Sequence, residues 1–331
     1  MFSLVISLLA AFLVSLAVTL IVTPFIFNRL FRRGITGKDF NKFEKPEVAE
    51  MGGIGAIFGF SFGMMAVIFI YTYLNSGINL NLALLLAAIT TIVLVGFLGI
   101  VDDLIGWKKG IKQWQHALFP IFAALPLMAL KAGTTEMAFP FIGYISFGII
   151  YSIILIPIGI TGASNAFNML AGFNGLEASL GIISLSTLFL IAFFSGSIEA
   201  MFLLAVMIGA LIGFLRYNWF KAKVFPGDSL TLMIGAALAT AVIIGNMEKF
   251  GVMIMALFFV ELVIKARHRF KSECFGIPQK NGTLKARPEG GSITQWVMRR
   301  GKFTEVQVVL IILSMQLVVS AITFASFWFK V

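Results

Sequence analysis

Residues 82–103 read LALLLAAITTIVLVGFLGIVDD, in which twenty uncharged and mostly apolar residues run directly into two carboxylates. A helix needs about 20 such residues to cross the hydrocarbon core of a bilayer. The stretch therefore predicts a membrane-spanning helix with Asp102 and Asp103 at its end. Acids beside the membrane are costly to keep there, so they indicate a functional site by default.

The rest of the 331-residue chain has the same character. It is 59% hydrophobic and only 12% charged, whereas a soluble domain carries about a quarter charged residues. This composition predicts an all-α integral membrane protein, folded as a single polytopic domain over residues 1–331. The net charge of +10 does not indicate nucleic-acid binding, because the cations lie beside the apolar runs. The single Cys274 excludes an intramolecular disulfide and a cysteine-based metal site.

Apolar runs of sufficient length predict ten transmembrane helices. Prolines break or kink the fourth and fifth runs, where neighbouring helices can satisfy the freed backbone groups. The predicted spans are Leu4–Phe27, Gly52–Leu74, Leu82–Val101, Trp114–Leu130, Tyr144–Ile160, Leu176–Ser195, Glu199–Leu215, Ser229–Ile244, Phe250–Ala266 and Glu305–Phe329.

Lysine and arginine are distributed unequally between the loops. All but three of the 25 fall in the loops after the first, third, seventh and ninth spans, and loops with this bias face the cytoplasm. Both termini are therefore expected outside. No cation precedes the first apolar run, which predicts a retained span rather than a secretory signal. The predicted cytoplasmic loops are 28–51, 102–113, 161–175, 216–228 and 267–304.

Two of these loops carry polar side chains without an obvious structural need. Residues 161–175 hold no charge but contain Asn165, Asn168 and Asn174 among glycines. This composition suits a cradle for a nucleotide, a sugar or a metal-bound diphosphate, and an interrupted helix packed in protein is the alternative. Asp228 starts the eighth span after a basic stretch, either as an oxygen ligand for Mg2+ or as a helix N-cap.

The remaining candidates are acids and cations near the membrane edge. Asp102 and Asp103 either handle a proton or a divalent cation, or form a solvated cap at the bilayer edge. Arg267, His268 and Arg269 attract phosphate or anchor the ninth span in the membrane. Together, the acids, the amides and the basic loops predict transfer of a phosphorylated group to a membrane-held acceptor.

Four motifs, spread along nearly the whole chain, resemble the polyprenyl-phosphate N-acetylhexosamine-1-phosphate transferase family. The most specific of them is Asn165–Glu177. Residues 292–301 lack the histidines of the bacterial motif at that place, which favours the eukaryotic-type branch that uses UDP-GlcNAc and dolichyl phosphate. The motifs are Gly37–Lys42 followed by Glu50, Asp102-Asp103 with Lys112, Asn165–Glu177, and Tyr217–Trp219 continued by Gly227–Ser229.

This resemblance implies a reaction and a set of residue roles. A polyprenyl phosphate such as dolichyl phosphate attacks the sugar-linked phosphorus of UDP-GlcNAc, giving lipid-diphosphate-GlcNAc and UMP. Asp228 and Asn168 would hold Mg2+, or Mn2+, which also suits oxygen ligands. Asp102 and Asp103 would position or deprotonate the lipid phosphate. The substrate-binding residues that follow from the motifs are Lys42, Glu50, Lys112, Asn165, Asn174, Glu177, Asn218, Arg267, His268 and Arg269.

The resemblance also implies a place in the cell. It suggests an archaeal cell membrane, with the active site on the cytoplasmic face, and the first membrane step of N-glycan assembly. The expected partners are UDP-GlcNAc, the polyprenyl phosphate and the lipid bilayer, without nucleic acid, and a homodimer is left open. Two alternatives also stay open, namely another UDP-N-acetylhexosamine donor within the family and a membrane transporter. A transporter would place its polar residues at the midplane, whereas here they gather at one face.

Overall fold

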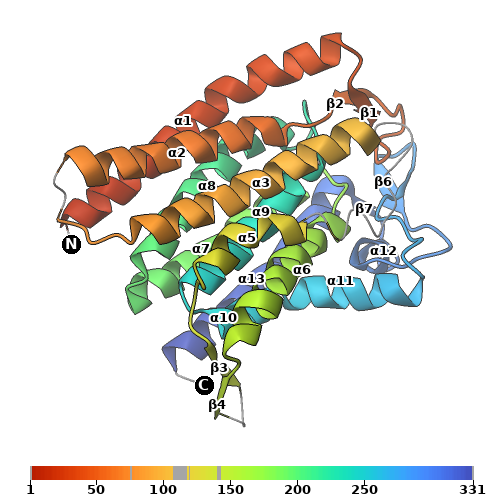
Figure 1. Cartoon of the computed structure of the whole chain (residues 1–331). Coiled ribbons are helices and arrows are strands. Elements are labelled where there is room, and N and C mark those ends of the chain that lie inside the picture. Colours follow the sequence, from red (N-terminus) through yellow and green to blue (C-terminus); the bar gives the residue numbers. More distant parts are fainter. Residues whose placement is uncertain (1, 75–76, 107–117, 119, 140–142, 330–331) are drawn as a thin grey trace.

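The protein is an all-α integral membrane protein, described here by a computed structural model that covers residues 2–74, 77–106, 118, 120–139 and 143–329 (Figure 1). Among these residues, eight helical segments are long and apolar enough to cross a membrane. They are α1 (Phe2–Arg32), α2 (Gly53–Tyr73), α3 (Leu82–Gly106), the π-helical turn η1 (Tyr151–Leu155) continued by α6 (Ile156–Met169), α7 (Leu176–Ser195), α8 (Ile198–Asn218), α9 (Gly227–Ile244) and α13 (Glu305–Trp328).

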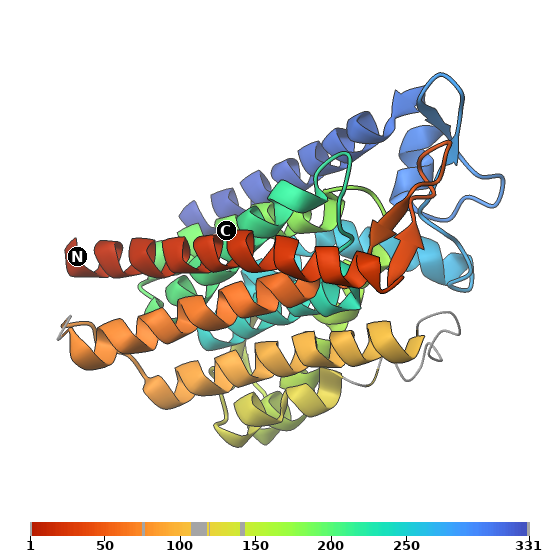
Figure 2. The same cartoon turned by 90° about the horizontal axis from the view of Figure 1, so that it is seen from above.

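The two ends of the bundle differ in what they carry. Figures 1 and 2 show strands β1 (Thr36–Lys38) and β2 (Glu47–Ala49) at one end, with β6 (Thr283–Lys285) and β7 (Phe303–Thr304) beside them. Both chain termini lie at the opposite end. The loops that contain these strands are ones that the charge bias assigns to the cytoplasm. Which side of the membrane each end faces stays a prediction.

Short elements complete the fold. Strand β5 (Ile277–Pro278) pairs with β6, and β6 pairs with β7, in a small antiparallel sheet that lies next to α12 (Ile293–Met298). At the other end of the bundle, β3 (Glu136–Phe139) and β4 (Gly143–Ser146) form a second antiparallel pair, and β3 contacts helix α10 (Glu248–Ile254). The short helix α5 (Leu125–Ala129) contacts α6.

Helix α9 is the most enclosed of the eight spans, with 89% of its apolar window buried. Its neighbours approach closely because small residues stand at the crossings. A side chain at Gly235 would overlap the backbone of Ala163 on α6, and a side chain at Gly99 on α3 would lie 2.5 Å from the Cα atom of Ser229. Helices α3 and α6 therefore contact α9 almost backbone to backbone, and the residues at its start are fixed by both.

Two of the ten predicted spans were wrong in their limits. The fifth, Tyr144–Ile160, begins in strand β4, and the helix starts at Tyr151 and continues to Met169. Pro157 stands in the first turn of α6, where a proline is tolerated, so it does not end the helix. Much of the predicted loop 161–175 is consequently helical.

The ninth predicted span, Phe250–Ala266, was also wrong, since it consists of two helices. Helix α10 (Glu248–Ile254) ends before Met255, and α11 (Ala256–Arg267) begins after it. Both halves contact α13, and in addition α10 packs against α9 and α11 against α6. Part of the fourth predicted span, Trp114–Leu130, lies outside the described residues.

Candidate active site

Two loops that are far apart in the sequence pair at the start of α9. The Phe225 N–H donates to the carbonyl of Ala49 at 2.8 Å, the Gly52 N–H donates to the carbonyl of Phe225 at 2.9 Å, and Gly53 continues the pairing at 2.9 Å to Pro226. Glu50 therefore stands beside the segment that leads into Asp228. The sequence contains both acids but gives no sign that they meet.

Asp103 reaches the same place from α3. One of its carboxylate oxygens accepts the N–H of Asp228 at 2.8 Å, and the other accepts the N–H of Ser229 at 3.2 Å. These N–H groups belong to the first turn of α9, where a helix lacks internal acceptors. The capping role that one interpretation gave to Asp228 is therefore performed by Asp103. Gly227, at a φ of +67°, leaves room for the carboxylate.

The carboxylates at this point repel one another. Burial raises the pKa of Glu50, and the negative charge of Asp228 raises the pKa of Glu50 further. Asp102, next to Asp103, is buried with 4% of its surface exposed. We call Glu50, Asp102, Asp103 and Asp228 the acidic cluster. A positive charge placed there would relieve the repulsion, and the start of a helix adds a further positive potential.

The acidic cluster fits a cation that is only partly held by protein. The described residues bring no three His, Cys, Asp or Glu side chains into a closed metal-binding group. Mg2+ in phosphate-transfer sites is usually held by one or two carboxylates, with water and substrate phosphates as its other ligands. Asp228 is half-buried at the helix start and suits this role, whereas both oxygens of Asp103 already accept backbone N–H groups.

The predicted amide cradle lies across from the acidic cluster on α6. Helices α6 and α9 cross at Ala163 and Gly235 and run antiparallel, since Tyr151 and Ile243 both lie against Gly133 at their other ends. Asn168 is five residues beyond the crossing and Asp228 is seven, which places them roughly 8 and 10 Å beyond it at 1.5 Å per residue. The two residues predicted to share a cation thus stand at the same level of the bundle.

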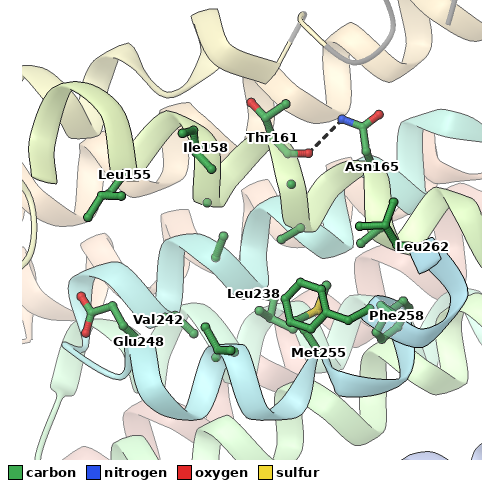
Figure 3. A pocket seen from close by; sticks show the side chains of 18 of the residues that line it. Leu155, Ile158, Thr161, Asn165, Leu238, Val242, Glu248, Met255, Phe258 and Leu262 are labelled. Carbon is green, nitrogen blue, oxygen red and sulfur yellow. Dashed lines mark hydrogen bonds between the residues drawn. The ribbon is translucent and has the colours of Figure 1, made fainter. Parts of the chain in front are cut away.

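An apolar groove of about 1030 Å³ runs along α6 to this level (Figure 3). Its walls come from η1, α6, α9, α10 and α11, and α6 with η1 extends for 19 residues, or about 28 Å. At one end of the groove are Asn165, Asn168 and Lys265. At the other end the Tyr151 hydroxyl donates to Glu248. Between these ends the lining is almost entirely apolar.

Asn165 and the basic triplet are placed differently from each other. The Asn165 amide donates to the carbonyl of Thr161, one turn back on its own helix, at 2.8 Å and lines the groove (Figure 3). Arg267, His268 and Arg269 are exposed at the end of α11 and do not line the groove. The cation that does line it is Lys265, which sequence reasoning counted only as a cytoplasmic charge.

Three predicted substrate-binding residues are buried in the protein. Asn218 has no exposed surface, and its amide accepts the Gly175 N–H at 3.1 Å and donates to the carbonyl of Val224 at 2.9 Å. Glu177 accepts the Gly172 N–H at 2.6 Å. Asn174, 3% exposed, is held by Glu305 and Asp39. In this conformation these three side chains shape the loop after α6 instead of facing open space.

Lys42 belongs to the same buried network. Its ammonium lies 3.0 Å from Asp39 and forms an ion pair with Glu305 at the start of α13. Asn41 beside it donates to the carbonyl of Gly172 at 2.9 Å and accepts the Gly276 N–H at 2.9 Å. Asn41 therefore ties the loop after α6 to the loop between β1 and β2 and to the segment after α11.

The sequence predicts only some members of this network. Asp39 and Asn41 lie inside the motif Gly37–Lys42, which assigns them no role, and Glu305 is predicted only as the first residue of a span. A charged residue at the start of an apolar run was the available signal for Glu305. Lys112 lies outside the described residues.

Comparison with known proteins identifies a family and several relatives. Residues 84–246 match the family described as glycosyl transferase family 4. A Sulfolobus acidocaldarius protein, provisionally named a UDP-N-acetylglucosamine–dolichyl-phosphate N-acetylglucosaminephosphotransferase, is 39% identical over 92% of this chain and 91% of its own length. A Saccharolobus solfataricus protein with the same provisional name is 36% identical over 96% of each chain. The Schizosaccharomyces pombe enzyme of that name is 29% identical over 73% of this chain and 62% of its own.

Proposed function

The chain belongs to glycosyl transferase family 4, and from this membership we propose that it transfers GlcNAc 1-phosphate from UDP-GlcNAc to dolichyl or another polyprenyl phosphate. The products are polyprenyl-diphosphate-GlcNAc and UMP. The observation that carries the proposal is that one end of the apolar groove, at Asn168, lies at the level of Asp228 in the acidic cluster. A lipid tail and a charged diphosphate need opposite surroundings, and this part of the protein offers both side by side.

The groove suits the carrier. A polyprenyl chain is apolar and long, and the groove is apolar for most of its roughly 28 Å. Lys265 at one end would attract the carrier phosphate, with Asn165 and Asn168 as uncharged hydrogen-bond partners. The opposite end offers the acid Glu248, which would repel a phosphate. The carrier is therefore expected to bind with its phosphate at the end near Asp228.

The acidic cluster suits the donor diphosphate. A Mg2+ ion held there by Asp228, with Asn168 across from it, would neutralise the phosphate charges and polarise the phosphorus that is attacked. The carrier phosphate is already largely a dianion at neutral pH, so it needs alignment more than deprotonation. Asp103 holds the N–H groups of Asp228 and Ser229 and thereby fixes the Asp228 side chain. Mn2+ would serve in the same way.

The cellular setting is part of the same proposal. The charge bias of the loops puts the acidic cluster on the cytoplasmic face, where UDP-sugars are made. The two relatives that match this chain over more than nine tenths of its length come from archaea. We therefore place the enzyme in an archaeal cell membrane, at the start of N-glycan assembly.

The test is UMP release by detergent-purified protein supplied with UDP-GlcNAc, with each of Mg2+ and polyprenyl phosphate present or omitted. Release that requires both components supports the proposal. Release with a different UDP-N-acetylhexosamine only would keep the family and change the donor. No release with any donor would refute the transferase assignment.

The site assignment is tested by one pair of variants. Asp228→Asn should lower turnover at least about 100-fold, the scale of removing one charge-stabilising group, while the protein still purifies as a folded species. Glu136→Gln is the matched control, because Glu136 is an exposed acid on β3 at the opposite end of the bundle. Near-normal turnover by Asp228→Asn would refute the role given to Asp228.

A further inference from the structure

The wall of the apolar groove is broken at one point. Helix α10 ends at Ile254 and α11 begins at Ala256, so the helix is interrupted at Met255, whose ψ of 4° departs from the helical value. The last carbonyls of a helix have no N–H donor within it. In the apolar interior of a membrane protein such groups need another partner, because no water is available to them.

Gln316 of α13 supplies that partner. Its side chain has no exposed surface, and its amide nitrogen donates to the carbonyl of Ile254 at 3.0 Å. The same nitrogen lies 3.0 Å from the hydroxyl oxygen of Ser184 on α7, to which it also donates. A single amide therefore joins the break to two spans that are outside the groove.

The residues after the break form one side of the groove. Met255, Phe258 and Leu262 line it beside Lys265 (Figure 3). Phe258 also packs against Phe167 of α6, with ring centroids 4.3 Å apart. The direction in which α11 leaves the break therefore decides how wide the groove is and where Lys265 stands.

We propose that Gln316 is a positioning residue for the lipid carrier, which sets the angle between α10 and α11 and so the shape of the groove. Gln316 does not line the groove itself. It acts through the end of α10, at the break that precedes α11. This inference rests on the proposed function, because it takes the groove to hold the polyprenyl chain.

The position of the break makes the expected effect depend on the length of the carrier. Met255 lies ten residues before Lys265, or about 15 Å along α11. Geranyl phosphate has a main chain of eight carbons, which spans at most about 12 Å with bonds near 1.5 Å, so its tail ends before the break when its phosphate is at Lys265. A carrier of eleven isoprene units passes the break.

The experiment compares these two carriers in Gln316→Met, which keeps the length of the side chain and removes the donor. The KM for the long carrier should rise about tenfold, the factor that corresponds to loss of about one hydrogen bond. The kcat/KM for geranyl phosphate and the KM for UDP-GlcNAc should stay within twofold. An equal loss with both carriers, or no loss with either, would overturn the proposal.

Two further variants separate positioning from general stability. Thr323→Val is the matched control, because Thr323 is fully buried on α13 but donates only to Val319 of its own helix, at 2.8 Å. It should leave both carriers unchanged. Ser184→Ala removes only the second contact of Gln316 and provides a milder variant should Gln316→Met not fold. It should raise the KM of the long carrier selectively, by less than tenfold, and an unselective effect would again overturn the proposal.

A measurement without substrate keeps this inference apart from the proposed function. Spin labels at Val252 on α10 and Arg267 on α11 report the angle across the break. Their distance distribution should be narrow in the parent chain and shifted or broadened in Gln316→Met. An unchanged distribution would overturn the inference even if the transferase activity is confirmed. Absence of activity in the parent chain would refute the proposed function and leave the distance result to decide this inference.

Discussion

Gly235→Ala tests whether the α6–α9 crossing brings the two halves of the active site together. The added Cβ atom would overlap the carbonyl of Ala163 and lie 2.5 Å from the Cα atom of Ser164. Ordinary contacts begin at 3.4 Å, so α6 and α9 must separate by at least about 0.9 Å there to clear Ser164 alone. Backbone atoms cannot swing aside as a side chain does, and overpacking of this kind costs about 1–3 kcal/mol.

The catalytic effect should exceed the effect on stability. Asn168 and Asp228 stand on the two helices that must separate, and a displacement near 1 Å can lower turnover on the order of 100-fold. UMP release should therefore fall by about two orders of magnitude at saturating substrates, while the protein still purifies as a single folded species. The same comparison made in detergent and in lipid vesicles would exclude an effect of the detergent.

Gly162→Ala is the matched control for this prediction. It makes the same chemical change on α6, but its Cβ atom would meet nothing within 4 Å. Alanine favours a helix over glycine by roughly 0.5–1 kcal/mol, so this variant should be as stable as the parent or more so. Because Gly162 lines the groove, the comparison is made at saturating carrier, where turnover should be normal. If Gly235→Ala behaved like Gly162→Ala, the close crossing would not be what aligns Asn168 with Asp228.

Three further predictions concern single side chains. Burial and the charge of Asp228 raise the pKa of Glu50, so the stability that its protonated form contributes is complete below pH 4.5 and is lost as pH rises through the folded-state pKa. In the presence of a chelator, Glu50→Gln should therefore raise the Tm at pH 7 to 8. A gain in Tm that does not shrink towards pH 4.5 would contradict this. Burial raises the pKa of the Cys274 thiol, so the rate of maleimide labelling at pH 7 should be at least roughly tenfold lower in the folded protein than in the denatured protein. Equal rates would show that Cys274 is accessible. Asn218→Leu leaves the Gly175 N–H and the Val224 carbonyl without the Asn218 amide. At about 1–3 kcal/mol for each group, the unfolding free energy should fall by about 2–6 kcal/mol, measured by denaturant titration with the exposed Asn281→Ala as control. A loss below about 1 kcal/mol would show that another group takes the place of the amide.

The fold class followed from the sequence because the bilayer imposes a simple rule on it. Apolar length alone identifies spans, and it placed Leu176–Ser195 at the limits that α7 has in the structure. The same rule failed at Met255, since a break in the middle of an apolar run leaves no mark in composition. The carbonyl of Ile254 at this break is bound by Gln316 on another helix, a partner that a local pattern cannot show.

The candidate site was predictable in its residue types and less so in its geometry. Asp103 is predicted as a costly acid beside the membrane, Asp228 as an oxygen ligand for Mg2+ and Glu50 from the family resemblance, and the structure brings all three to the start of α9. Their division of labour was not predictable, because the cap on α9 comes from α3. The buried positions of Asn174 and Asn218 were not predictable either, since the sequence of an amide-rich motif does not distinguish side chains that face a ligand from side chains that hold a loop.

The ion pair between Lys42 and Glu305 joins positions 263 residues apart. Ribosomes add roughly 5–20 residues per second, so Lys42 leaves the ribosome on the order of 13 to 53 seconds before its partner exists. During that interval Lys42 lacks Glu305 and keeps only its ion pair with Asp39, and the loop after α6 has no Glu305 to hold the N–H of Asn174. The network around Asn174 is thus completed only when α13 is made, and a chain released before Glu305 would carry every residue of the acidic cluster without that support.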